Sequence, residues 1–504
     1  MARDYSKIDK DVRDTGFFSE YLPPCFELNP EVFLRIPPKN CDLIPAYSYT
    51  MSRFNGNNSR RNIYIPEIGA YAVVHNFLKE NSIIQEIIEF TENYTHSFSP
   101  ILGNDDTLMR HEQSYSRESE PEVNTVSTYI DNIVNKIIRA SGAKSILKLD
   151  ISNCFSSFYC HMMPAIMLGI ENTEEEFRKS LLNREDASIN PLYTKYRELD
   201  ETVRRQTENR TNGLLIGPLS SKIIVEGLLT RIDIELESCG INFSRYVDDY
   251  EVYIYDDNYK QIISTFSKIL RKYGFSLNNE KTEIVDFPYY VTENLDKIID
   301  AYNETDSSDD CFMGLFNSFF EIEENGTKGA IRYLLKTIEK NPIKVKNHKL
   351  MKAYLLSILN NNERSLTKAC SLLIQHKEKI ILNSEDIDLL KVMLKNHLSM
   401  HHDLEVLWIL YVLIECNKII QGEAMIESIV SSDNELAHIM LFRRNLLNNI
   451  QEKTIVNKAK SWILLYELFV NSIITEQEIT QKLNLNKNLE MYRTMKNRNI
   501  HFCN

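Results

Sequence analysis

Apolar residues repeat with a helical spacing throughout the last third of the chain. From Ile343 to Asn504 there is no proline and only one glycine, Gly422, so few residues there interrupt a helix. Segments such as KLMKAYLLSILN and EVLWILYVLIECNK place apolar residues three or four positions apart and are separated by polar clusters of Asn, Ser and Asp. This pattern predicts successive helices. It fits either stacked antiparallel helix pairs, as in an α-solenoid, or an irregular helical bundle.

The middle of the chain, from Ala143 to Phe287, shows a different periodicity. Strands are predicted for five short segments rich in β-branched and aromatic residues, SILKLDIS, FSRYV, YEVYIY, FSLN and KTEIVDF. Helices are predicted for SKIIVEGLLTRIDIELES, opened by Pro218 with Ser220 and Ser221 as candidate caps, and for YKQIISTFSKILRKYG. The order strand, helix, hairpin, helix, strand predicts an α+β sheet with helices on one face and an open face for a ligand.

Composition adds limits to this picture. The chain has 504 residues, more than one ordinary core holds, which predicts two or three domains. It is 43% hydrophobic and 26% charged, has no apolar run long enough to span a membrane, and begins with a charged segment instead of an apolar signal core. Its nine cysteines include no CxxC pair. We therefore expect a soluble, cytoplasmic protein with no membrane partner, no disulfide framework and no zinc site.

The net charge of −13 argues against a general nucleic-acid-binding protein, which usually carries an excess of basic residues. Charge can still be local, and two short segments, Ser52–Asn62 and 204–210, are basic. Each is explained equally well by a solvated surface and by a nucleic-acid contact. The overall charge therefore narrows the range of partners without selecting one.

Three aspartates mark the candidate chemistry. Asp150 ends the predicted strand ILKL, and Asp248 and Asp249 lie in the turn between FSRYV and YEVYIY. A strand end and a hairpin turn on neighbouring strands bring their side chains to one patch, where carboxylates repel one another unless a cation lies between them. Two Mg²⁺ ions, or Mn²⁺ in their place, meet this requirement and suit phosphoryl transfer. We expect Asp150, Asp248, Asp249 and Ile151 as metal ligands; the alternative is a set of solvated turn acids.

These segments resemble the sequence motifs of the reverse-transcriptase palm. LKLDISNCFSSFY is similar to motif A, RYVDD to the YxDD sequence of motif C, and GFSLNNEKTEIV to motif D. NGLLIGPLSSKIIVE resembles motif B, although it has a G-x-x-x-G-P-x-x-S form in place of the common Q-G-x-x-x-S-P form. The motifs occur in the expected order between Ser141 and Phe287. The resemblance implies a DNA polymerase that uses dNTPs.

Further segments resemble the abortive-infection reverse transcriptases of bacteria, the AbiK-like family of phage-defence polymerases. SRRNIYIPEIGAYA, the Tyr-x-His after motif A, VDFPYY and NGTKGAIRYLL all have counterparts there. The resemblance implies template-independent synthesis on a protein hydroxyl, a covalently attached single-stranded DNA product, and a homo-oligomer, either a trimer or a hexamer. The implied fold is α+β, with fingers in residues 1–142, a palm in residues 143–290, and an α-helical, HEAT-like repeat domain in residues 291–504 in place of a thumb.

Several residues are candidates for nucleotide binding. Phe155 occupies the place of the aromatic gate that, by the resemblance, excludes a ribose 2′-hydroxyl. Arg60 or Arg61 offers a planar guanidinium for the triphosphate. The others are two glycines that permit close backbone approach, the proline after them, and a lysine after motif D for the pyrophosphate: Gly213, Gly217, Pro218 and Lys281. Each also has an ordinary explanation as a core, loop or surface residue.

By the resemblance, a tyrosine provides the hydroxyl on which synthesis begins. The chain has 26 tyrosines. Tyr47 and Tyr49 lie in a polar segment just before the finger motif, and Tyr5 lies in the charged N-terminal segment. These three are the candidate priming residues.

Three functions are compatible with the sequence. The first is a protein-primed, template-independent DNA polymerase that acts in abortive infection against phage. The second is a templated RNA-directed DNA polymerase that copies a dedicated RNA, which a conventional thumb and a basic surface would favour. The third is a catalytically silent scaffold with a palm fold, and the complete set of Asp150, Asp248 and Asp249 argues against it.

Overall fold

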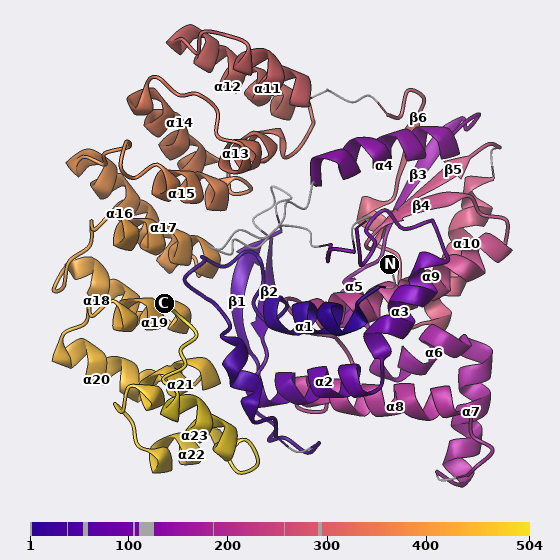
Figure 1. Ribbon diagram of the computed structural model, residues 1–504. Coiled ribbons are helices and arrows are strands. Elements are labelled where there is room, and N and C mark those ends of the chain that lie inside the picture. Colours follow the sequence, from indigo (N-terminus) through magenta and orange to yellow (C-terminus); the bar gives the residue numbers. More distant parts are fainter. Residues whose placement is uncertain are drawn as a thin grey trace.

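The computed structural model describes residues 3–37, 39–53, 59–103, 106–109, 125–184, 186–256, 258–290 and 295–504, with only the backbone described for 125–131. Residues 54–58 of the predicted basic segment therefore lie outside the described part. The molecule has a β-sheet with covering helices, a separate two-stranded hairpin, and a curved row of helices formed by the C-terminal part (Figure 1). No helix in the described ranges is long and apolar enough to cross a bilayer.

The sheet has four antiparallel strands in the order β4–β5–β3–β6. Their bounds are β3 Ser145–Asp150, β4 Phe243–Tyr246, β5 Asp249–Ile254 and β6 Glu283–Asp286. Strand β3 lies between β5 and β6 and is buried at most positions, as its apolar sequence predicts. One predicted strand is wrong: FSLN forms no strand, because it begins directly after Gly274, whose φ of +82° turns the chain, and only Leu277 makes a bridge, to Ile151.

Helix α9, Leu219–Ser238, is the most buried helix next to the sheet and contacts α3 (Ile83–Glu92), α6 (Met163–Leu168) and α10 (Tyr259–Lys272). Pro218 is its N-cap residue. The serines Ser220 and Ser221 do not cap it; both are buried inside the first turn, where their side chains face the core. The other helices of this part are α1 (Tyr5–Thr15), α2 (Ile68–Glu80), α4 (Thr125–Arg139), α5 (Cys154–Ser157), α7 (Ile170–Leu182) and α8 (Pro191–Val203), with short 3₁₀ turns η1 (Pro30–Leu34), η2 (Cys160–Met162), η3 (Arg204–Thr207) and η4 (Asn279–Lys281).

The finger hairpin consists of β1 (Tyr47–Ser52) and β2 (Arg60–Ile65), which pair antiparallel. It is joined to the loop before α9 by a backbone hydrogen bond, in which the Tyr64 N–H donates to the Ile216 carbonyl at 2.7 Å. In Figure 1 the hairpin lies between the sheet and the C-terminal helices. It therefore connects the two halves of the molecule.

Helices are the only regular elements among the described residues of the C-terminal part, and they stack in sequence along one side of the molecule (Figure 1). Helices α13, α15, α17, α19 and α21 each contact the next one in this series, and α23 follows α21, which is the arrangement of stacked helix pairs and not of an irregular bundle. The predicted fold, an α+β palm followed by a helical repeat-like domain, is thereby confirmed. The bounds are α11 Leu295–Asn303, α12 Asp309–Glu324, α13 Ala330–Lys340, α14 His348–Asn361, α15 Leu366–Gln375, α16 Ser384–Ser399, α17 Asp403–Glu415, α18 Ala424–Ser431, α19 Glu435–Arg443, α20 Asn449–Lys458, α21 Trp462–Val470, α22 Glu476–Leu483 and α23 Leu489–Asn497.

The helical row shares a hydrophobic core with the finger segment, not with the sheet. This core joins residues between 17 and 72 to residues between 299 and 503. Polar contacts reinforce it: fully buried Glu67 accepts hydrogen bonds from Asn488 at 2.8 Å and from the Tyr492 hydroxyl at 3.0 Å. Burial raises the pKa of the Glu67 carboxyl, and these hydrogen bonds reduce the size of that increase. The C-terminal domain therefore holds the fingers in place.

Candidate active site

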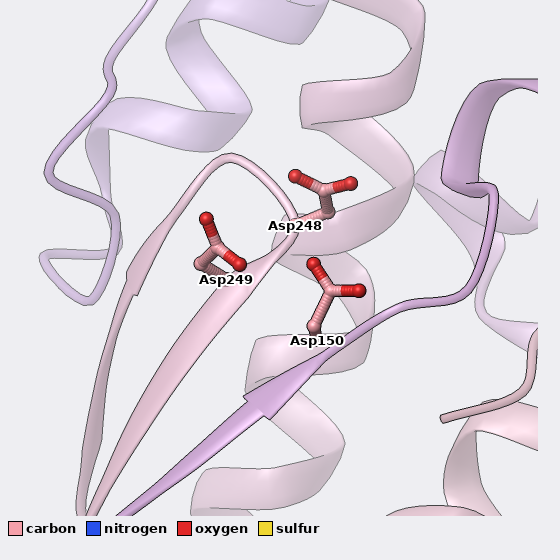
Figure 2. Close-up of side chains that lie close together, drawn as sticks. All are labelled: Asp150, Asp248 and Asp249. Carbon is pink, nitrogen blue, oxygen red and sulfur yellow. The ribbon is translucent and has the colours of Figure 1, made fainter. Parts of the chain in front are cut away.

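The structure brings the three predicted aspartates together (Figure 2). Asp150 is the last residue of β3 and pairs directly with Asp249, the first residue of β5. Asp248 lies in the turn just before it, and its carbonyl accepts a hydrogen bond from the Ile151 N–H at 3.1 Å. One carboxylate oxygen from each aspartate lies within 4.8 Å of the others. Sheet register, not chance proximity, sets this arrangement, because a strand end faces a hairpin turn on its neighbour.

Two basic or polar groups already compensate the charge of Asp150. The Lys281 ammonium donates to one carboxylate oxygen at 2.7 Å, and the Asn278 amide donates to the other at 3.1 Å. Partial burial lowers the pKa of Lys281, but its hydrogen bond to Asp150 and the nearby aspartate charges outweigh that effect and raise the pKa overall. Lys281 therefore stays charged beside the cluster.

The other two aspartates are less well compensated. The pKa of Asp248 is raised by burial and by the charge of Asp150. The pKa of Asp249 is raised to about 7, first by burial and then by its contact with Asp150 and the charge of Asp248. Carboxylates that repel one another at this distance favour a bound cation.

The donor set fits a hard divalent cation. Three carboxylates within reach of one another are the oxygen ligands that Mg²⁺ uses beside substrate phosphates, and Mn²⁺ accepts the same donors. Ile151 directly follows Asp150, and because its hydrocarbon side chain has no donor atom, only its main-chain carbonyl is a candidate ligand. Asp150, Asp248 and Asp249 would hold the ion or ions.

A cleft of about 360 Å³ is lined by Asp248 and Asp249, but not by Asp150. Phe155, on α5 five residues after Asp150, forms part of its wall, together with the loop before α9 and the turn that carries Asp248 and Asp249. The full lining consists of Ser19, Glu20, Tyr21, Arg61, Ile63, Phe155, Ile216, Gly217, Pro218, Leu219, Lys222, Tyr246, Val247, Asp248 and Asp249. The cleft is thus built from the fingers, the palm and an N-terminal segment.

The two adjacent arginines of β2 have different surroundings. Arg61 lines the cleft and Arg60 does not, although the Nε of each is buried without a hydrogen-bond partner among the described atoms. Arg60 instead forms an ion pair with buried Glu405 of α17. Successive residues of a strand point to opposite faces, so only one of the pair can face the cleft.

Two glycines shape the loop between α8 and α9. Gly217 lines the cleft with a φ of +134°, and a Cβ there would lie 2.6 Å from the Tyr64 carbonyl oxygen. Gly213, with a φ of +92°, lies next to the Ser156 carbonyl but not in the cleft lining. Pro218 follows Gly217 in the lining and is the N-cap residue of α9. The loop thus approaches both the finger strand and α5 closely.

The predicted priming tyrosines do not line the cleft. Tyr49 is completely buried, Tyr47 packs against the core shared with the C-terminal helices, and Tyr5 contacts Arg3 at the start of α1. Two other tyrosines do line it, Tyr21 and Tyr246.

Sequence reasoning missed the N-terminal contribution to the cleft. The stretch GFFSEYLPP is dense in aromatic residues and prolines, which indicates an ordered segment. Nothing in its spacing indicates that Ser19, Glu20 and Tyr21 line the same cleft as Asp248 and Asp249. Lys222 was also missed; it lines the cleft and donates to the Met109 carbonyl at 2.8 Å.

Comparison with known proteins supports a polymerase. Residues 98–334 match the family model described as "Reverse transcriptase (RNA-dependent DNA polymerase)". No curated protein matches the sequence. Among solved structures, telomerase from Candida albicans with a TWJ fragment of telomeric RNA has 14% identity and a TM-score of 0.29, with 76% of this chain and 67% of that chain covered. Apo telomerase from Candida tropicalis has 11% identity and a TM-score of 0.32, with 80% of this chain and 70% of that chain covered.

At these TM-scores the telomerase likenesses carry no argument. The conclusion rests on the family match, which spans the four-stranded sheet and the cluster of Asp150, Asp248 and Asp249. The chain carries a reverse-transcriptase domain, and the protein is an enzyme, a nucleotidyltransferase of the DNA-polymerase type.

Proposed function

We propose that this protein is a protein-primed, template-independent DNA polymerase that uses dNTPs and carries its single-stranded DNA product covalently. One observation supports this most directly: Tyr21 lines the same cleft as Asp248 and Asp249. A tyrosine of the chain itself therefore contributes to the wall of the cleft that contains two of the three aspartates.

The position of Tyr21 is fixed from both sides. The Trp408 indole N–H of α17 donates to the Tyr21 carbonyl at 2.7 Å. On the N-terminal side, Phe17 and Phe18 pack edge to face with ring centroids 4.7 Å apart, and Leu22 is buried on the other side. Anchored neighbours on both sides fix the backbone of Tyr21, which lines the cleft and also packs against the core shared with the C-terminal helices. We therefore favour Tyr21 over Tyr47, Tyr49 and Tyr5 as the priming residue.

Other cleft residues, and Lys281 beside Asp150 outside the cleft lining, would bind the nucleotide. A divalent cation held by the aspartates would polarise the phosphate and favour deprotonation of the acceptor hydroxyl. Arg61 binds the triphosphate with its guanidinium. Phe155 limits the space at the sugar and so selects dNTPs. Lys281 exchanges Asp150 for the departing pyrophosphate, while Gly217 and Pro218 let the backbone approach the nucleotide.

Arg61 and Arg60 offer a matched pair of variants. Arg61→Ala should raise the KM for dNTP about tenfold or more, because it removes charge-assisted hydrogen bonds to phosphate, and should leave the melting temperature unchanged. Arg60→Ala should instead lower the free energy of unfolding by about 3 kcal/mol, since Glu405 is left buried and unpaired. Steady-state kinetics and denaturant unfolding of both variants distinguish the roles. A larger KM effect in Arg60→Ala would reverse the assignment.

The priming proposal is tested by incubating the purified chain with Mg²⁺ and a labelled dNTP and no nucleic acid. The label should remain on the protein through SDS denaturation, and mass spectrometry should place it on Tyr21. Tyr21→Phe should abolish labelling, whereas Tyr47→Phe, Tyr49→Phe and Tyr5→Phe should not. Labelling that persists at another residue would show that Tyr21 is not the priming residue, while protein priming itself would still hold. Synthesis that needs an RNA template and a primer would establish the templated alternative, to which the description of the matched family points.

The cellular part of the proposal is that the protein acts in the cytoplasm, as a homotrimer or homohexamer, in abortive infection against phage. The resemblance of its motifs to the AbiK-like family supports it. Cells that express the unmutated chain should reduce phage plaque formation, and cells that express Asp248→Asn should not. Equal plaque numbers with both proteins would contradict this role, and light scattering of the purified chain tests the oligomer.

A further inference from the structure

The turn that carries Asp248 and Asp249 contains an unfavourable backbone conformation. Val247 is the first residue of the two-residue loop between β4 and β5, which Tyr246 and Asp249 close as a pair, and its φ is +55°. A positive φ at the first loop position is the pattern of a type II′ turn, which favours glycine there. For a β-branched residue such a φ is strained and persists only where the surroundings hold it.

Both backbone groups of Val247 are held by buried side chains. Its N–H donates to the Ser99 hydroxyl at 2.9 Å, and its carbonyl accepts from Arg245 Nη1 at 3.0 Å. Ser99 is 4% exposed and Arg245 is fully buried, and neither lines the cleft. The peptide groups on the two sides of Val247 are therefore held by buried residues that lie outside the cleft lining.

Two carboxylates of α9 fix Arg245 in turn. Its terminal nitrogens donate to the two oxygens of Glu226, each at 2.9 Å, and its Nε donates to Asp233 at 2.9 Å. Glu226 and Asp233 are seven residues apart on the helix, so they point the same way, and both are buried. The Tyr250 hydroxyl also donates to Asp233, at 3.0 Å. This planar, multiply bonded geometry suits a guanidinium and not an ammonium.

Ser99 is fixed through its own segment, which runs beside β4. The Arg245 N–H donates to the His96 carbonyl at 2.8 Å, and the Phe98 N–H donates back to the Arg245 carbonyl at 2.7 Å. The His96 ring stacks on Phe243 with centroids 4.4 Å apart. The segment that carries Ser99 is thus hydrogen-bonded to β4, the strand that carries Arg245. These backbone hydrogen bonds fix the position of Ser99 relative to Arg245.

We propose that Ser99 and Arg245 form a clamp that holds Val247 in its left-handed conformation and thereby positions Asp248 and Asp249 for cation binding. They are positioning residues, because they touch neither the cation nor the nucleotide. A buried arginine with two buried acids is weak evidence for stability, since an apolar core of the same volume is often as stable. Setting the place of two metal ligands gives this network a function, because metal sites depend on the groups that orient their ligands.

The test measures Mn²⁺ binding to the purified full chain without nucleotide, by electron paramagnetic resonance of the free ion. Ser99→Ala should raise the Kd for Mn²⁺ about tenfold, and should lower the rate of dNTP incorporation by a similar factor. Its melting temperature is recorded in parallel. A purely structural role predicts the opposite result, a lower melting temperature with an unchanged Kd, and that result would overturn the proposal.

Two variants at position 247 separate the effect of backbone strain from the effect of losing the valine side chain. Val247→Gly and Val247→Ala both remove the side chain, but only glycine adopts a positive φ without a Cβ penalty. Adding Ser99→Ala should therefore raise the Kd for Mn²⁺ much less in the glycine background than in the alanine background. Equal effects in both backgrounds would show that Ser99 does not act on the conformation of Val247. A chain that binds no Mn²⁺ without these changes would equally overturn the proposal.

Discussion

Replacing Asp248 with asparagine should abolish nucleotide incorporation while the protein stays folded. The three carboxylates lie within 4.8 Å of one another, and an amide in place of one of them removes a charged ligand from the cation site. The loss should be about a thousandfold or more, since several kcal/mol of transition-state stabilisation depend on the cation. Incorporation of labelled dNTP with Mg²⁺ measures this, and Asp249→Asn should behave in the same way.

The same substitution, Asp248→Asn, should leave the stability of the metal-free protein unchanged or increase it, although it abolishes activity. The pKa of Asp248 is raised in the folded protein by burial and by Asp150, so the ionised carboxylate destabilises the fold at pH values above its unfolded pKa. Without metal at pH 8, Asp248→Asn should therefore melt at the same temperature as the unmutated chain or higher. Asp286→Asn is the matched control, because Asp286 is an exposed acid at the end of β6 and should affect neither quantity. Full activity in Asp248→Asn would refute the metal role.

The sequence pattern predicted most of the individual strands and helices, because each depends on residues that are close together in the chain. The strands of the sheet and the β4–β5 hairpin followed from short β-branched segments around a turn, and the hairpin register pairs Tyr246 with Asp249. Asp150 faces Asp249 through the pairing of β3 with β5, which are distant in the sequence. The helices after Ile343 followed from the absence of proline, the presence of only one glycine, and the helical spacing of apolar residues. FSLN failed as a strand because four residues of suitable composition do not form a strand unless a neighbour pairs with them along their length.

The residues that complete the site depend on tertiary packing, which spacing does not reveal. Arg60 and Arg61 are equivalent in the sequence, and only the docking of β2 decides which one faces the cleft and which one pairs with Glu405. Tyr21 reaches the cleft because α17, almost 400 residues later in the sequence, holds its backbone. Glu226 and Asp233 were visible as acids in an apolar helix, which was a usable signal for a buried partner such as Arg245.

Gly217→Ala should be the most destabilising single change at the cleft. Gly217 has a φ of +134°, and an added Cβ would lie 2.6 Å from the Tyr64 carbonyl oxygen and 3.2 Å from a methyl group of Ile63. The oxygen cannot withdraw easily, because the neighbouring Tyr64 N–H is bonded to the Ile216 carbonyl at 2.7 Å. The free energy of unfolding should fall by about 3 kcal/mol or more, measured by denaturant unfolding.

Gly240→Ala provides the control that separates backbone strain from the close approach. Gly240 also has a positive φ, +75°, but nothing lies within 4 Å of an added Cβ, so this change should cost only about 1 kcal/mol. Because the contact at Gly217 joins β2 to the palm, Gly217→Ala should also displace Arg61 and reduce dNTP incorporation, whereas Gly240→Ala should not. Equal losses of stability in the two variants would mean that the hairpin is not held against this loop.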